Sequence, residues 1–217
     1  MNVAVVIGAS GLVGKQLLLA LSENPRYDKI ICLDRRPITS PLSKITRKII
    51  DFDHLIDVDL GLDSTALADG FCCLGTTHKK AGSRKNFFQV DHDYVVQFAQ
   101  LMWRYQTHHL AIVSSLGASA KTLSHYSRTK GLMEEAVRGL GLVSVSFLRP
   151  SLLLGPREES RPLEDWFKPA SKLIPSARFR GIEASDVAKA MMALAEEAKP
   201  GYQIYPSEII RHIAEAY

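Results

Sequence analysis

Cysteine is scarce in this chain, which excludes a disulfide-stapled fold. There are 3 cysteines among 217 residues, whereas small disulfide-rich domains carry several pairs at regular spacings. Cys32 lies in an apolar run, and Cys72 and Cys73 are neighbours that would point to opposite faces of a strand. We expect all three to be small core residues in a reducing compartment.

Long apolar runs and an excess of one charge are also missing. No stretch approaches the roughly 18 apolar residues that a membrane-spanning helix needs, and a glycine turn at residue 8 begins too early for a cleavable leader to precede it. The formal net charge is only +4, which is short of a nucleic-acid binder's signature. The histidines show no spacing that suggests a metal site. We therefore expect a cytoplasmic protein without metal, membrane span or nucleic-acid partner.

The first fourteen residues hold the most informative pattern. An apolar run over residues 3–7 passes directly into glycines at 8, 11 and 14, and a helix-forming stretch follows. A strand, a tight turn and a helix N-terminus bring backbone N–H groups and the positive end of the helix dipole to one point, where a pyrophosphate can bind. The spacing therefore predicts a dinucleotide site. The expected contacts are Gly8, Ser10, Gly11, Leu12, Val13 and Gly14.

Strand and helix patterns alternate along the rest of the chain. Short apolar strands separated by helices are typical of a parallel sheet that is covered on both faces. The pattern predicts an α/β fold, a Rossmann-type doubly wound parallel sheet with ligands at the carboxyl ends of its strands. The expected strands are residues 3–7, 29–33, 48–50, 70–74, 110–114 and 143–148, and the expected helices are 12–22, 91–105, 127–139 and 185–197.

The composition and the hydrophobic periodicity of the sequence change after Pro150. Four prolines, the first at 156 and the last at 175, interrupt a stretch of basic and aromatic residues with little periodicity. We expect a single domain over residues 1–217, with a small C-terminal substrate cap formed mainly by residues 151–217.

The second expected strand ends in Asp34, Arg35 and Arg36. An acid about 20 positions after the glycine turn binds the ribose hydroxyls in NAD enzymes, whereas an arginine there accommodates a 2′-phosphate. The two planar guanidinium groups favour NADP(H) over NAD(H). Asp34 would repel the phosphate unless it turns away or pairs with an arginine.

Other strand ends are expected to contact the same cofactor, because the carboxyl ends of parallel strands converge. For Asp51, at the end of the third strand, a purely structural role as a strand-end acid is the alternative. The expected contacts are Asp51 and Phe52 at the adenine, Leu74, Gly75 and Thr76 along the cofactor, and Pro150 and Ser151 near the nicotinamide carboxamide.

The strongest catalytic signal is Tyr126 with Lys130, downstream of the strand-end pair Ser114 and Ser115. Residues four apart lie one turn apart on the same face of a helix. A phenol of ordinary pKa about 10 is a poor base at neutral pH, but an adjacent ammonium stabilises its anion and makes it a usable general acid/base. We expect Tyr126 to be the acid/base, Lys130 its electrostatic partner and a ribose ligand, and Ser115 to orient the substrate. Ser114 is the fallback, since only one of the two serines can face the site.

These motifs resemble the short-chain dehydrogenase/reductase superfamily, in its extended or atypical branch. The resemblance covers nearly the whole chain, including G-A-S-G-L-V-G at residues 8–14, L-R-P-S at 148–151 and E-A-S-D-V-A at 183–188. The segments F-C-C-L-G-T-T at 71–77 and V-D-H-D-Y at 90–94 are similar to the Tat-interactive oxidoreductase-like proteins and their bacterial relatives. The resemblance implies an NADP(H)-binding Rossmann domain with a small cap, without a settled reaction.

The sequence departs from this pattern at one position and leaves the activity open. Many extended members carry an asparagine on the helix after the fourth strand, where Gln89 is expected here. We predict hydride transfer between the nicotinamide and a small carbonyl or alcohol substrate. The alternatives are a regulatory or scaffold protein that senses NADP(H), with a partner surface between Pro156 and Pro175, or a nucleotide-sugar epimerase/dehydratase-like enzyme. A homodimer and a monomer are both open.

Overall fold

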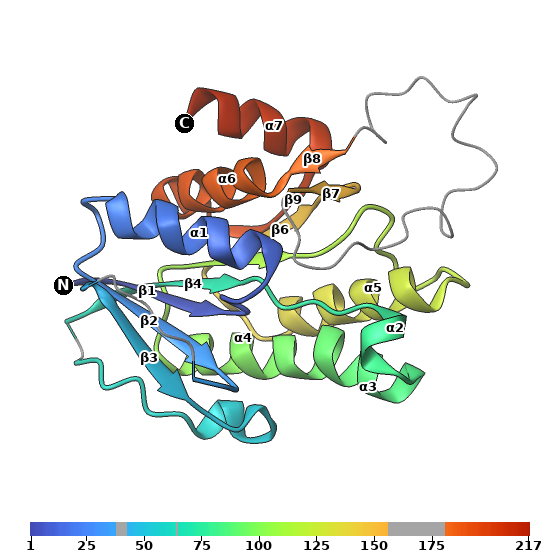
Figure 1. Ribbon diagram of the computed structural model, residues 1–217, viewed down its shortest axis with the longest axis horizontal. Helices are drawn as coiled ribbons and strands as arrows, with labels where there is room; N and C mark the ends of the chain where they lie inside the picture. The colour runs from blue at the N-terminus through green and yellow to red at the C-terminus, as the bar shows by residue number, and fades with distance from the viewer. Residues whose placement is uncertain (38–42, 64, 156–180) are drawn as a thin grey trace.

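Seven parallel strands form the central sheet of the protein, in the order β3-β2-β1-β4-β5-β6-β9. The computed structural model describes residues 1–37, 43–63, 65–155 and 181–217. The sheet confirms the expected Rossmann-type α/β fold (Figure 1). Its strands are β1 (Asn2–Ile7), β2 (Lys29–Asp34), β3 (Ile45–Ile49), β4 (Leu67–Cys72), β5 (His109–Val113), β6 (Ser144–Arg149) and β9 (Gly201–Pro206).

Helices cover both faces of the sheet, and β1 shows why. Its side chains alternate between two cores, because successive residues of a strand point to opposite faces. Ala4 and Val6 belong to one buried cluster, whereas Val3, Val5 and Ile7 belong to the other. The first cluster lies under α1 (Leu12–Glu23) and α6 (Ala184–Glu197), with α7 (Ser207–Ala216) against α6, and the second lies under α4 (Tyr94–Arg104) and α5 (His125–Arg138) (Figure 1).

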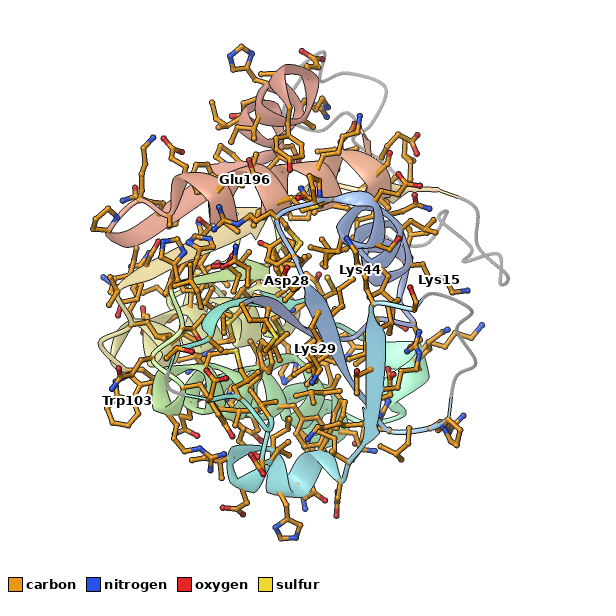
Figure 2. All side chains as sticks on the ribbon, turned by 90° about the vertical axis from the view of Figure 1, so that its left-hand side faces the viewer. Lys15, Asp28, Lys29, Lys44, Trp103 and Glu196 are labelled. Atoms are coloured by element: carbon orange, nitrogen blue, oxygen red, sulfur yellow. The ribbon has the colours of Figure 1, made fainter. Side chains whose placement is uncertain are left out.

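The carboxyl ends of the parallel strands meet at one edge of the sheet. After β1 the chain builds outward through β2 and β3, then returns to place β4 on the other side of β1. Such a reversal of strand order is where α/β sheets bind their ligands. The amino ends lie at the opposite edge, which faces the viewer in Figure 2, with Asp28 and Lys29 labelled beside the start of β2.

Short elements fill the connections around the carboxyl edge. The helix expected over residues 91–105 is preceded by two short helices and begins with a π-helical turn before α4. A second, two-stranded sheet pairs β7 with β8. These elements are η1 (Phe52–Asp57), α2 (His78–Ala81), α3 (Arg84–Phe88), η2 (Gln89–Asp93), β7 (Leu153–Leu154) and β8 (Ile182–Glu183).

The end of the chain differs most from expectation. β9 pairs with β6 in the main sheet, and α7 follows it, although the helix over residues 185–197 was expected to be the last. β9 is a half-buried edge strand, so it lacks the continuous apolar run that marked the inner strands. Residues 156–180, with the prolines and the expected partner surface, lie outside the described residues. The substrate cap therefore stays a prediction.

The third strand also differs from its prediction. It runs over Ile45–Ile49 rather than 48–50, because it is the other edge strand and carries Arg47 and Lys48 among its apolar residues. Within the ranges that the structure describes, no helix is long and apolar enough to cross a membrane.

Candidate active site and cofactor site

The glycine turn after β1 packs backbone against backbone. Gly8 has a positive φ of 81°, which favours glycine, and a Cβ built on it would lie 2.6 Å from the carbonyl carbon of Cys73. A Cβ on Gly14 would lie 2.3 Å from the Gly8 oxygen. Side chains at these two positions would therefore separate β1 from α1 and from the end of β4.

The N-terminus of α1 begins directly after this turn. Gly11 is its N-cap, in extended conformation, so the N-cap residue has no side chain to cap the helix, and the first turn of the helix contains no acid. The N–H groups of Leu12, Val13 and Gly14 have no partner within the helix, as at any helix start. A pyrophosphate fits this cradle, because the N–H groups and the helix dipole favour an anion where no Cβ fills the space.

An ion pair that the sequence analysis missed lies at the end of β2. The Asp34 carboxylate is buried and lies 2.5 Å from Nη1 of Arg47 on β3. Neither neighbouring arginine makes this contact. Arg36 is exposed, and the Arg35 guanidinium lies over the Phe52 ring, 5.4 Å from its centroid. Only the register of β2 with β3, which places Arg47 beside Cys32, could have identified the partner.

Asp51 and Phe52 lie where the chain leaves β3. Asp51 accepts a hydrogen bond from the Asp53 N–H at 3.0 Å and caps η1. Phe52 is buried and meets the Tyr94 ring edge-on, with centroids 5.5 Å apart. These contacts explain both residues structurally, and a role at the adenine stays a prediction.

The loop after β4 lies between the glycine turn and α5 and is close to both. Leu74 is buried, and its backbone nitrogen would lie 2.8 Å from a Cβ on Gly8. The Thr76 N–H donates to Oδ2 of Asp91 at 2.8 Å. A Cβ on Gly75 would lie 4.0 Å from Nζ of Lys130. Three predicted site segments therefore meet here: the glycine turn, the β4 loop and Lys130.

Lys130 forms a buried ion pair with Asp91 of the π-helical turn. Its Nζ lies 2.8 Å from Oδ1 of Asp91, and the two side chains are 3% and 1% exposed. Burial opposes the ammonium charge, but the negative charges of Asp91 and, when ionised, Tyr126 outweigh it, so the pKa of Lys130 lies above its ordinary value. Tyr126 lies one helical turn earlier, half-buried, with its ring 5.6 Å from that of Phe87.

Gln89 and Asp91, both in the π-helical turn, have different partners. Gln89 points elsewhere, since its Nε2 donates to Oδ1 of Asp53 at 2.9 Å. The residue that reaches Lys130 is Asp91, two positions later. A signal was present: Asp91 stands in the same apolar stripe as Tyr94, Val95 and Phe98, where an acid is buried and needs a partner.

The two serines at the end of β5 have different partners. Ser114 donates to Oε1 of Glu134 at 2.5 Å, and Arg149 binds the same buried carboxylate through Nε and Nη2. Among the residues that the structure describes, the Ser115 hydroxyl donates to the neighbouring carbonyl of Leu116, at 3.2 Å. Ser114 is thus committed to a structural network, which favours Ser115 as the serine of the site.

The residues after β6 are tied to their surroundings by the backbone. The Pro150 carbonyl accepts from the Leu116 N–H at 2.9 Å, which joins the ends of β5 and β6. The Ser151 N–H donates to Oγ of the buried Ser207 at 2.5 Å, at the start of α7. Pro150 and Ser151 are therefore held at the carboxyl edge, and their contact with a nicotinamide stays a prediction.

A parallel sheet with an open glycine turn at its switch point defines an NAD(P)-binding protein of the Rossmann class. The profile of the NAD dependent epimerase/dehydratase family matches residues 4–205. The chain belongs to this family.

Named relatives narrow the class further. The chain is 35% identical to Protein HTATIP2 of Rattus norvegicus over 162 residues, which are 73% of this chain and 66%, just under two thirds, of that protein. It is 33% identical to "Protein fmp52, mitochondrial" of Emericella nidulans over 229 aligned positions, covering 97% of this chain and 98% of that protein. These relatives confirm the atypical short-chain family that the motifs predicted.

The comparison with named relatives also shows that the expected cytoplasmic location is wrong. Relatives from several fungi, including Aspergillus fumigatus and Candida albicans, are named as mitochondrial proteins. Composition and a lack of apolar runs could not reveal this, because neither is specific to one compartment.

Solved structures show the same fold. MoeE5 in complex with UDP-glucose and NAD has a TM-score of 0.68 and 20% identity, over 98% of this chain and 81% of that one. WbmF of Bordetella bronchiseptica in complex with NAD+ has a TM-score of 0.70 and 14% identity, over 98% and 76%. At such identities the likeness extends to the fold alone.

Proposed function

We propose that this protein is an NADP(H)-dependent oxidoreductase of the atypical short-chain type, which acts on a small carbonyl or alcohol. The observation that carries the proposal is the buried ammonium of Lys130, one helical turn from Tyr126 and against the loop that follows β4. A buried lysine is costly and marks a functional site more often than an exposed one does.

The residues that would hold the cofactor run along the carboxyl edge of the sheet. The first turn of α1 would bind the pyrophosphate, Arg35 and Arg36 the 2′-phosphate, and Lys130 the nicotinamide ribose. When bound, the nicotinamide supplies or accepts the hydride.

The chain's own residues would manage the proton and the substrate oxygen. Tyr126 would donate a proton to the carbonyl oxygen, or accept one from the alcohol. Lys130 would stabilise the phenolate that remains after proton donation. Ser115 would hydrogen-bond the same substrate oxygen, because the hydroxyl of Ser114 already serves Glu134.

The proposal is tested by cofactor titration followed by a screen of aldehydes and ketones. NADPH is expected to bind more tightly than NADH, and Tyr126→Phe should abolish turnover while NADPH affinity stays within about twofold, because the loss is confined to proton transfer. Tyr202→Phe is the matched control, since it removes a buried hydroxyl without a hydrogen-bond partner in the described structure, near the amino end of β9. Undiminished turnover in Tyr126→Phe would refute the mechanism.

A second function, sensing NADP(H) without turnover, is favoured by one observation. The Asp91 carboxylate lies 2.8 Å from the Lys130 ammonium and offsets the charge that should act on Tyr126. A sensor would bind NADPH tightly and reduce no compound in the screen. A reproducible Tyr126-dependent reduction of any carbonyl would exclude it.

A further inference from the structure

We propose that Arg47 determines the cofactor preference by holding the Asp34 carboxylate in an ion pair, so that the end of β2 accepts the 2′-phosphate of NADP(H). The inference rests on the proposed NADP(H) function. It explains how a chain with an acid at the ribose position can still favour the phosphorylated cofactor.

The geometry places the pair at the ribose end of the cofactor site. Arg47 lies opposite Cys32 in the parallel register, and Asp34 follows Cys32 on the same face of the sheet. The Arg47 side chain therefore reaches forward along the strands to Asp34, where Nη1 lies 2.5 Å from Oδ2. The side chains are 15% and 4% exposed, so water screens this pair only weakly.

The pair removes the charge that would oppose a phosphate. Asp34 contributes −1 and Arg47 contributes +1, so the pair is neutral and Arg35 and Arg36 remain as the cationic side chains that follow β2. Both of those residues are exposed, and Arg35 is steadied over the Phe52 ring. Without Arg47, a buried carboxylate would stand unpaired beside the phosphate, where like charges repel.

The test measures dissociation constants of NADPH and NADH for the wild type, Arg47→Met, Asp34→Asn and the double variant, by fluorescence titration or calorimetry. Arg47→Met should weaken NADPH binding about tenfold or more, because it exposes the phosphate to the Asp34 charge, while NADH binding changes less than about threefold. Asp34→Asn should bind NADPH at least as well as the wild type. The double variant should recover NADPH binding to within about threefold of Asp34→Asn, since no carboxylate remains to be neutralised.

Arg138→Met is the matched control, because it removes an exposed arginine at the end of α5 without touching β2 or β3. Equal weakening of NADPH and NADH in Arg47→Met would overturn the inference, as would a double variant that folds but does not recover NADPH binding. If Arg47→Met does not fold, the NADPH dissociation constants of Asp34→Asn and the double variant are compared instead. A difference above about threefold would show that Arg47 acts independently of Asp34 and would overturn the inference.

This outcome is separable from the proposed function. A wild-type protein that prefers NADH refutes the NADP(H) preference by itself. An NADPH-to-NADH ratio that is the same in Arg47→Met and wild type refutes only the role of Arg47.

Discussion

Neutralising Asp91 should cost a large part of the protein's stability. The carboxylate lies 2.8 Å from the Lys130 ammonium, and both side chains are almost fully buried. Breaking a buried ion pair by removing one partner costs about 3–5 kcal/mol, because the other charge stays buried and uncompensated. Asp91→Asn keeps an oxygen that can accept from the Thr76 N–H. We therefore expect the lower end of that range, about 3 kcal/mol of unfolding free energy.

The pH dependence follows from the sign of the shift on Lys130. Its pKa is raised in the folded protein above the ordinary 10.5, so its stabilising contribution is fully present below that pH and is lost as the pH rises through the folded value. The difference between wild type and Asp91→Asn should therefore be constant between about pH 7 and pH 9.

Urea unfolding followed by circular dichroism measures these differences. Lys130→Met should cost a similar amount, because it leaves the Asp91 carboxylate unpaired. The double variant, Asp91→Asn with Lys130→Met, should lie within about 1 kcal/mol of the wild type, since a neutral pair of similar volume is often as stable as a buried ion pair. Single variants that each cost less than about 1 kcal/mol and combine additively would refute the buried pair.

Two other changes test the packing and the acid sensitivity of the fold. Gly14→Ala should lower the free energy of unfolding, measured in urea, by about 3 kcal/mol, because its Cβ would meet the Gly8 oxygen at 2.3 Å. Leu19→Ala, on the exposed side of α1, is the control and should lower it little. Equal losses in the two variants would contradict the close approach of Gly14 to Gly8. Burial lowers the pKa of His109 to about 3, so its neutral form stabilises the fold at neutral pH and this contribution is lost as the pH falls below about 6.5. Between pH 7.5 and pH 5, the unfolding free energy of His109→Gln should therefore fall by about 2 kcal/mol less than that of the wild type. Parallel curves of unfolding free energy against pH for the two proteins would contradict the lowered pKa of His109.

The fold was predictable because its signals are local. The glycines at 8, 11 and 14 and the apolar strands act within a few residues, so their pattern is written in consecutive positions. The edge strand β9 was missed because it is half-buried, and its residues pair with β6 rather than repeat an apolar pattern of their own. The apolar stripe marks Asp91 as a buried acid, but its pairing with Lys130 depends on how the π-helical turn packs against α5, which is a tertiary contact.

By itself the sequence determined the class of this protein: a glycine turn after a first strand, a doubly wound parallel sheet, and a tyrosine and a lysine one helical turn apart. Only the tertiary structure decided how its charges are paired. Asp34 meets Arg47 across two strands, and Asp91 meets Lys130 across two helices. The physical reason is that a helix or strand pattern depends on near neighbours, whereas a buried charge is satisfied by whichever opposite charge the packing brings within about 3 Å.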